Sequence, residues 1–169
     1  TEHIIRSQTP ESAYDESFRQ MFDKFLRSQK SGKSYSLGSG FIIDSSGLIV
    51  TNAHVVERAS KIVITLNGVK NCEARIIAAD PLNDLALLKL ENPPAGLQAI
   101  RCDNSGKLFL GETVIAVGNP FGLDSSITVG ALSGTRRRFV WQGRTIFSDI
   151  LQTDAIVYPG NSGGPLVNI

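Results

Sequence analysis

Three short segments carry side chains that could do chemistry together. His54 follows Thr51-Asn52-Ala53, Asp84 precedes the apolar run Leu85–Leu88, and Ser162 lies within Gly160-Asn161-Ser162-Gly163-Gly164. Acyl transfer requires a hydroxyl that can become a nucleophile, a base that takes its proton and a carboxylate that orients the base. The three segments supply one of each, and they predict a catalytic triad of His54, Asp84 and Ser162.

The glycines around Ser162 suit the same chemistry. Glycine adopts backbone conformations that other residues avoid, and it lets a substrate approach the backbone closely. The amides of Gly160 and Ser162 could therefore point together at a developing oxyanion, where each donor stabilises the transition state by about 3–4 kcal/mol. We expect Gly160, Asn161 and Ser162 to form an oxyanion hole.

Each of these residues also has an ordinary structural interpretation. A single histidine is often a core residue, an aspartate before a strand is often a turn residue, and Gly/Ser/Asn clusters are often loops. Gly160–Gly164 also matches the G-x-S-x-G turn of α/β-hydrolase esterases. That turn precedes a helix and belongs to the order Ser, acid, His, whereas this chain has the order His, Asp, Ser and continues with Pro165-Leu166-Val167. The chymotrypsin order alone fits.

The sequence around these residues predicts that strands position them. Short β-branched or apolar runs alternate with Gly, Asn, Asp and Pro turn signals, and no long helical pattern separates them, so we expect an all-β fold of antiparallel strands. The expected strands are Gly40–Asp44, Leu48–Thr51, Lys61–Leu66, Ala74–Ala79, Leu85–Leu90, Thr113–Val117, Ser126–Ala131, Thr145–Leu151 and Pro165–Val167.

The first 36 residues have a different character. Thr9-Pro10-Glu11 is typical of a helix start, and a Phe-rich face over residues 18–26 repeats at helical spacing, which predicts a helix over residues 9–30 followed by a polar linker. The apolar face suits either core packing or association with another subunit.

Composition excludes several other classes of protein. The chain has 169 residues and a formal net charge of +1, which does not favour nucleic acid or an anionic membrane as partner. No apolar run is long enough for a membrane span, and residues 1–10 do not resemble a signal peptide. Two cysteines, Cys72 and Cys102, and two histidines are too few for a disulfide scaffold or a His/Cys metal cluster. We therefore expect no cofactor and no metal; whether the cysteines pair is open.

Several longer motifs are similar to those of the HtrA/Deg family, a branch of the chymotrypsin-fold, trypsin-like serine proteases. The resemblance covers about residues 37–169. It rests on segments 38–43, 47–56, 80–88, 116–122 and 152–155 and on Pro159–Leu166, with sequences GSGFII, GLIVTNAHVV, DPLNDLALL, AVGNPFG, QTDA and PGNSGGPL.

The resemblance implies a two-lobed chymotrypsin-like fold, with a first barrel at about 37–92 and a second at about 97–169, after an N-terminal helix and linker at 1–36. It implies an extracytoplasmic, often periplasmic, serine endopeptidase that acts on unfolded or misfolded proteins. Members commonly form homotrimers and carry PDZ domains after the protease domain. The roles of general base, orienting acid and nucleophile fall on His54, Asp84 and Ser162.

The resemblance also implies where specificity arises. In chymotrypsin-like enzymes the floor of the primary pocket lies six residues before the nucleophile, at Ile156 here, and we expect Val157 and Tyr158 to line the pocket with it. An apolar floor favours cleavage after small or medium aliphatic residues. Cleft loops would correspond to residues 119–123, 136–144 and 156–161. The basic cluster Arg136–Arg138, with Trp141 and Arg144, suits a solvated hairpin tip or a regulatory loop.

This chain departs from the family pattern in three respects. It has Tyr158 where the family often has a small polar residue, it contains no PDZ domain, and it ends at Ile169, before the strands that would complete the second barrel. An incomplete barrel leaves a strand edge bare. An alternative function is therefore a protease-fold module that binds unfolded polypeptide without cleaving it.

Overall fold

The computed structural model describes residues 37–57, 59–66, 69–103, 107–119, 125–141, 144–158 and 160–169. The predicted N-terminal helix and linker, residues 1–36, lie outside this set. Among the helices that the structure does describe, none has the length and apolar character needed to cross a bilayer.

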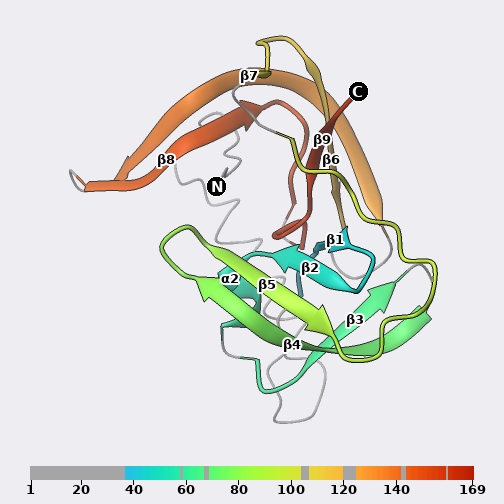
Figure 1. Ribbon diagram of the computed structural model, residues 1–169. Coiled ribbons are helices and arrows are strands. Elements are labelled where there is room, and N and C mark those ends of the chain that lie inside the picture. The colour runs from blue at the N-terminus through green and yellow to red at the C-terminus, as the bar shows by residue number, and fades with distance from the viewer. Residues whose placement is uncertain are drawn as a thin grey trace, which may run out of the picture.

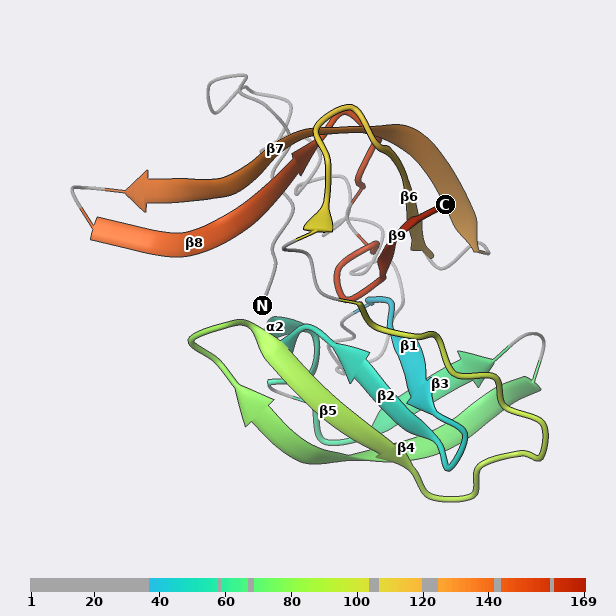
Figure 2. The ribbon, with the colours of Figure 1, turned by 45° about the horizontal axis from the view of Figure 1, so that its top comes forward.

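Two antiparallel sheets, one from each half of the described chain, make up the fold (Figures 1 and 2). The first sheet has the strand order β1-β2-β5-β4-β3 and the second has the order β8-β7-β6-β9. The first sheet contains β1 (Phe41–Asp44), β2 (Leu48–Thr51), β3 (Ile62–Leu66), β4 (Val69–Asp80) and β5 (Leu85–Leu90), with the four-residue helix α2 (Ala53–Val56) after β2. The second contains β6 (Thr113–Gly118), β7 (Ser126–Trp141), β8 (Arg144–Thr153) and β9 (Leu166–Asn168).

The two-residue alternation of the sequence gives each sheet one buried face. In β5 every second residue is buried, ending at Leu90, which is 1% exposed. β6 alternates in the same way through Val114 and Ala116. The strands expected over these segments are confirmed, and those over β1, β2, β3 and β9 differ from the structure by no more than one residue at each end.

Each sheet packs its buried face into its own core cluster. In the first sheet the buried members are Ile49, Val56, Ala86, Leu88 and Leu90. In the second they are Val114, Leu132 and Leu151, with Leu108 and Leu166 packed against them. Helix α2 contributes Val56 to the first cluster, which anchors the segment that carries His54.

The prediction for β7 was wrong in its length. The strand does not end at Ala131: it pairs with β6 over residues 126–131 and then with β8 from Leu132 to Trp141. Arg136–Arg138 therefore lie within a strand, with exposed side chains, rather than at a hairpin tip or in a loop. Strand-favouring Phe139 and Val140 continue the pairing beyond the arginines.

The β7–β8 hairpin bends along its length. Its pairing register shifts at several points, and Arg136 and Asp149 have positive φ angles of 51° and 58°. Bulges of this kind increase strand twist and curvature. Figures 1 and 2 both show the hairpin curving outward until its far end lies away from β6, from β9 and from the first sheet.

Candidate active site

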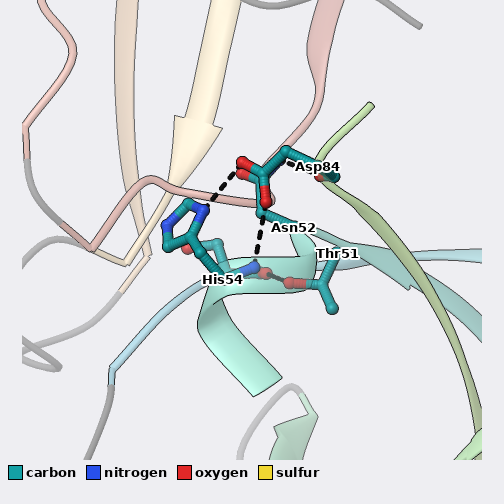
Figure 3. A network of polar contacts seen from close by, with 5 residues as sticks. Thr51, Asn52, His54 and Asp84 are labelled. Atoms are coloured by element: carbon teal, nitrogen blue, oxygen red, sulfur yellow. Dashed lines mark hydrogen bonds and ion pairs between the residues drawn. The ribbon is translucent and has the colours of Figure 1, made fainter. Parts of the chain in front are cut away.

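His54, in helix α2, and Asp84, in the turn before β5, lie in direct contact (Figure 3). The His54 Nδ1 atom is 2.7 Å from Asp84 Oδ2, and the backbone N–H of His54 donates to Asp84 Oδ1 at 2.9 Å. One carboxylate therefore holds both the ring and the backbone of the histidine. The His54 side chain is 55% exposed and that of Asp84 is 18% exposed, so the ring faces open space while the acid is largely covered.

The contact determines which nitrogen of the ring is available. A carboxylate can only accept hydrogen bonds, so the ring nitrogen beside it must carry the hydrogen. In neutral His54 the lone pair then lies on Nε2, on the side of the ring away from Asp84. The arrangement prepares His54 to accept a proton at Nε2 and stabilises the imidazolium that would form.

A compact turn before β5 presents Asp84. The Asp80 carboxylate accepts hydrogen bonds from the backbone amides of Leu82 and Asn83 and from Asn83 Nδ2 at 2.6 Å. The hydrogen bond from the Asn83 side chain, followed by that from its backbone, lowers the pKa of Asp80 below its ordinary value. Asp84 itself has φ of 52°, a left-handed conformation that Asp adopts more readily than most residues.

Asn52 ties this turn to the histidine segment. Its Nδ2 group donates to the Asp84 carbonyl oxygen at 2.8 Å. Asn52 precedes α2 directly, so the same two chain segments are joined by a side-chain to backbone bond as well as by the His54–Asp84 pair. The relative position of base and acid is thereby restrained at both residues.

Ser162 lies in a glycine-rich loop of the second half, the Ser162 loop (residues 160–164). Gly160 and Gly163 have φ of 98° and 86°, in the region that favours glycine. Asn161 N–H donates to the Tyr158 carbonyl at 2.9 Å, and Gly164 N–H donates to the Asn161 carbonyl at 2.8 Å. One tight turn therefore ends at Asn161, and a second, from Asn161 to Gly164, contains Ser162.

The expected oxyanion-hole residues differ in what their amides do. The Asn161 amide is committed to Tyr158, whereas in the described part of the chain no hydrogen bond from the amides of Gly160 and Ser162 is present. Asn161 is 7% exposed, and its Oδ1 atom has no hydrogen-bond partner among the described residues. Asn161 therefore fits the loop as a structural residue, whereas the amides of Gly160 and Ser162 make no hydrogen bond to the residues that the structure describes.

Two hydrogen bonds through the Ser39 backbone connect Ser162 with the His54 segment. The Ser39 N–H donates to the Ser162 carbonyl at 2.7 Å, and the Ser39 carbonyl accepts from Thr51 Oγ1 at 2.6 Å. Thr51 is three residues before His54. Between the described residues, no hydrogen bond joins the Ser162 hydroxyl to the His54 ring; such bonds are commonly loose until substrate is bound.

The expected pocket residues follow the end of β8. Ile156 and Tyr158 are 38% and 43% exposed, and Val157 is partly buried. Thr128 Oγ1 donates to the Ile156 carbonyl at 2.6 Å, which fastens this segment to β7. Gly130 allows the close approach, because a Cβ there would collide with the Ala155 backbone.

Sequence reasoning missed the residues that connect these parts. Ser39, Thr51, Asn52 and Thr128 hold the site segments together, yet their roles depend on partners far along the chain. The one available signal was the placement of Ser39 between Gly38 and Gly40, since paired glycines mark a close backbone approach.

Comparison with known proteins agrees with this geometry. Residues 38–169 match the family described as "Trypsin-like peptidase domain". The chain is 41% identical over 162 residues to a probable periplasmic serine endoprotease DegP-like of Ectopseudomonas mendocina, covering 90% of this chain and 32% of that protein. It is 39% identical over 173 residues to the putative serine protease HhoA of Synechocystis, covering 99% of this chain and 43% of that protein.

A solved structure is similar at the level of the fold. The HtrA-type protease AlgW with decapeptide aligns with a TM-score of 0.70 and 37% identity, over 78% of this chain and 39% of that one. The chain thus spans less than half the length of these relatives. The expected two-barrel, chymotrypsin-like all-β architecture is confirmed by this similarity and by the two curled sheets. The chain therefore belongs to the trypsin-like peptidase family, within its HtrA/Deg branch.

Proposed function

We propose that this chain is the peptidase domain of a serine endopeptidase that hydrolyses peptide bonds in unfolded or misfolded proteins. The observation that carries the proposal is the His54–Asp84 pair, in which one carboxylate holds both the ring and the backbone amide of the histidine. That arrangement leaves Nε2 of His54 available to take a proton from a hydroxyl.

In the proposed reaction Ser162 Oγ attacks the scissile carbonyl carbon while its proton passes to His54 Nε2. The amides of Gly160 and Ser162 donate to the resulting oxyanion. The intermediate then collapses, His54 gives its proton to the departing amine, and an acyl group remains on Ser162. A water molecule, deprotonated by His54, releases the acyl group by the same steps in reverse.

Substrate preference follows from Ile156 in the proposal. An apolar side chain at the base of the pocket cannot pair with a lysine or arginine of the substrate, so cleavage follows small or medium aliphatic residues. A peptide library measures this directly, and Ile156→Asp should shift the preference towards basic residues. A basic preference of the unmodified chain would contradict the assignment of Ile156.

The setting of the enzyme is part of the same proposal. The name of the DegP-like relative calls it periplasmic, which supports an extracytoplasmic location for this protein. A homotrimer is the proposed assembly, and light scattering at several protein concentrations tests it.

The decisive experiment is the intact mass of the protein after incubation with a fluorophosphonate, followed by a casein digest. We expect one adduct, absent from Ser162→Ala, together with casein cleavage. An adduct without cleavage would favour an esterase. A folded chain that forms no adduct but keeps unfolded casein in solution would favour a binding module without proteolytic activity.

A further inference from the structure

Ser39 takes part in four hydrogen bonds that meet at the candidate active site. Its N–H donates to the Ser162 carbonyl at 2.7 Å, and its hydroxyl donates to the Gly160 carbonyl at 2.6 Å. The same hydroxyl accepts from the Asn119 N–H at 2.8 Å, and the Ser39 carbonyl accepts from Thr51 Oγ1 at 2.6 Å. One residue thus contacts β2, the end of β6 and the Ser162 loop.

Two of the Ser39 bonds, together with one bond inside the loop, restrain consecutive peptide groups of the Ser162 loop. The carbonyl of Gly160 is held by the Ser39 hydroxyl, that of Asn161 by the Gly164 amide, and that of Ser162 by the Ser39 amide. A peptide group is planar and trans, so a carbonyl held on one side directs the N–H of the same group to the other side. The held Asn161 carbonyl therefore directs the amide of Ser162.

The backbone around Ser39 is packed too closely for the contact to be incidental. A Cβ at Gly163 would collide with the Ser39 carbonyl oxygen and with Thr51 Oγ1, and a Cβ at Gly38 would lie 3.2 Å from the Ser162 carbonyl oxygen. The glycines bring the two segments within hydrogen-bonding reach. The Gly160 carbonyl requires a hydrogen-bond donor and the Asn119 amide requires an acceptor. A hydroxyl group can serve both at the same time.

We propose that Ser39 is a positioning residue whose hydroxyl holds the Gly160–Asn161 peptide group, and whose amide holds the Ser162 carbonyl, so that the peptide group between them presents the Ser162 amide to an oxyanion. The proposal rests on the proposed peptidase function. In the proposed reaction, Ser39 itself contacts no reacting atom. A small displacement of catalytic groups is sufficient to slow an enzyme by orders of magnitude.

The test uses variants that differ in the hydroxyl alone. Ser39→Ala removes the hydroxyl without adding atoms. Ser39→Thr and Ser39→Val have side chains of nearly equal shape, and only the threonine keeps the hydroxyl. For Ser39→Ala and Ser39→Val we expect kcat for an ester substrate, and the rate of fluorophosphonate labelling, to fall roughly 10–100-fold with KM nearly unchanged. Ser39→Thr should retain most of the activity. Ser46→Ala, which removes an exposed hydroxyl in the β1–β2 turn, is the matched control.

A second measurement follows the loop without using activity. Hydrogen exchange of the Asn119 and Asn161 amides should become at least about tenfold faster in Ser39→Ala. The Asn119 amide donates to the hydroxyl that is lost, and the Asn161 amide belongs to the peptide group whose carbonyl that hydroxyl holds. Equal labelling rates per folded molecule, or unchanged exchange, would overturn the proposal even if the melting temperature falls. Failure of the unmodified chain to label would instead refute the peptidase function, while the exchange data would still decide the role of the hydroxyl.

Discussion

The two halves of the molecule build their share of the site by different means. On the first sheet, His54 and Asp84 are placed by side-chain contacts, with Asn52 and Asp80 restraining the segments that carry them. In the second half, the Ser162 loop is held by bonds to its own backbone carbonyls. In the proposed reaction, proton transfer requires a particular tautomer and oxyanion binding requires particular peptide directions, and each half restrains the group that its proposed task depends on.

The largest expected effect is the loss of the side-chain contact on the first sheet. Asp84→Asn should lower kcat by about 10⁴-fold, because an amide can hold the imidazole with its hydrogen on the wrong nitrogen. The fold should remain, since the residue keeps its shape. Steady-state kinetics and circular dichroism measure the two effects, with Asp103→Asn, in the exposed connection between the sheets, as control. A loss of less than tenfold would show that the pair does not orient the base.

The next largest effect concerns the backbone of the Ser162 loop. Gly163→Ala should destabilise the fold by about 2–5 kcal/mol, because alanine meets both a left-handed φ and a collision with the Ser39 carbonyl. Gly111 also has a left-handed φ, 85°, but no atom lies within 4 Å of a Cβ there. Gly111→Ala should therefore cost only about 1–2 kcal/mol. Urea unfolding compares the two, and equal losses would contradict the close contact at Gly163.

A buried threonine ends one strand in each half, which allows a matched comparison. Thr51 Oγ1 makes one described bond, to the Ser39 carbonyl, whereas Thr153 Oγ1 donates to the Ala131 carbonyl at 2.9 Å and accepts from the Ala155 amide at 3.1 Å. Thr51→Val should cost about 1 kcal/mol and Thr153→Val about 2 kcal/mol, because the first removes one side-chain hydrogen bond and the second removes two. Urea unfolding measures both, and the reverse order would show that the Ser39 contact is the stronger restraint.

The smallest expected effect is a change of stability with pH. The Asn168 side chain, followed by the Phe109 amide, lowers the pKa of Glu112 below its ordinary value of 4.5, as Asn83 does for Asp80. A carboxyl whose pKa is lower in the folded state stabilises the fold above its unfolded-state pKa, and this contribution is lost as pH falls through the folded-state pKa.

Melting temperature should therefore be constant near neutral pH and fall below about pH 4.5, with a shallower fall in Glu112→Gln. Asp80→Asn should reduce the fall of the melting temperature only at lower pH, since the ordinary pKa of an aspartate is 3.8. Both groups are exposed to solvent, which keeps the effects small. Melting curves from pH 3 to pH 7 check this, and variants with the slope of the unmodified chain would contradict it.

Local patterns made most of the fold predictable. The alternation of apolar residues in Leu85–Leu90 and Thr113–Gly118 is a property of neighbouring residues, so the strands there follow from sequence. Failures occurred where local signals conflict with pairing. Three arginines suggested the end of a strand, yet pairing with β8 carries β7 through them to Trp141. The four-residue helix α2, too short to show a period, was not anticipated.

The sequence by itself determined the residue types, their chain order and the alternation that buries one face of each sheet, because these depend on composition and near neighbours. Apart from the predicted contact of His54 with Asp84, only the tertiary structure decided which groups meet. The Ser39 hydroxyl and the Gly160 carbonyl are 121 residues apart in the chain. No periodicity encodes such a pair, because a long-range hydrogen bond depends on the distance and direction between segments that both sheets must first fold to bring together.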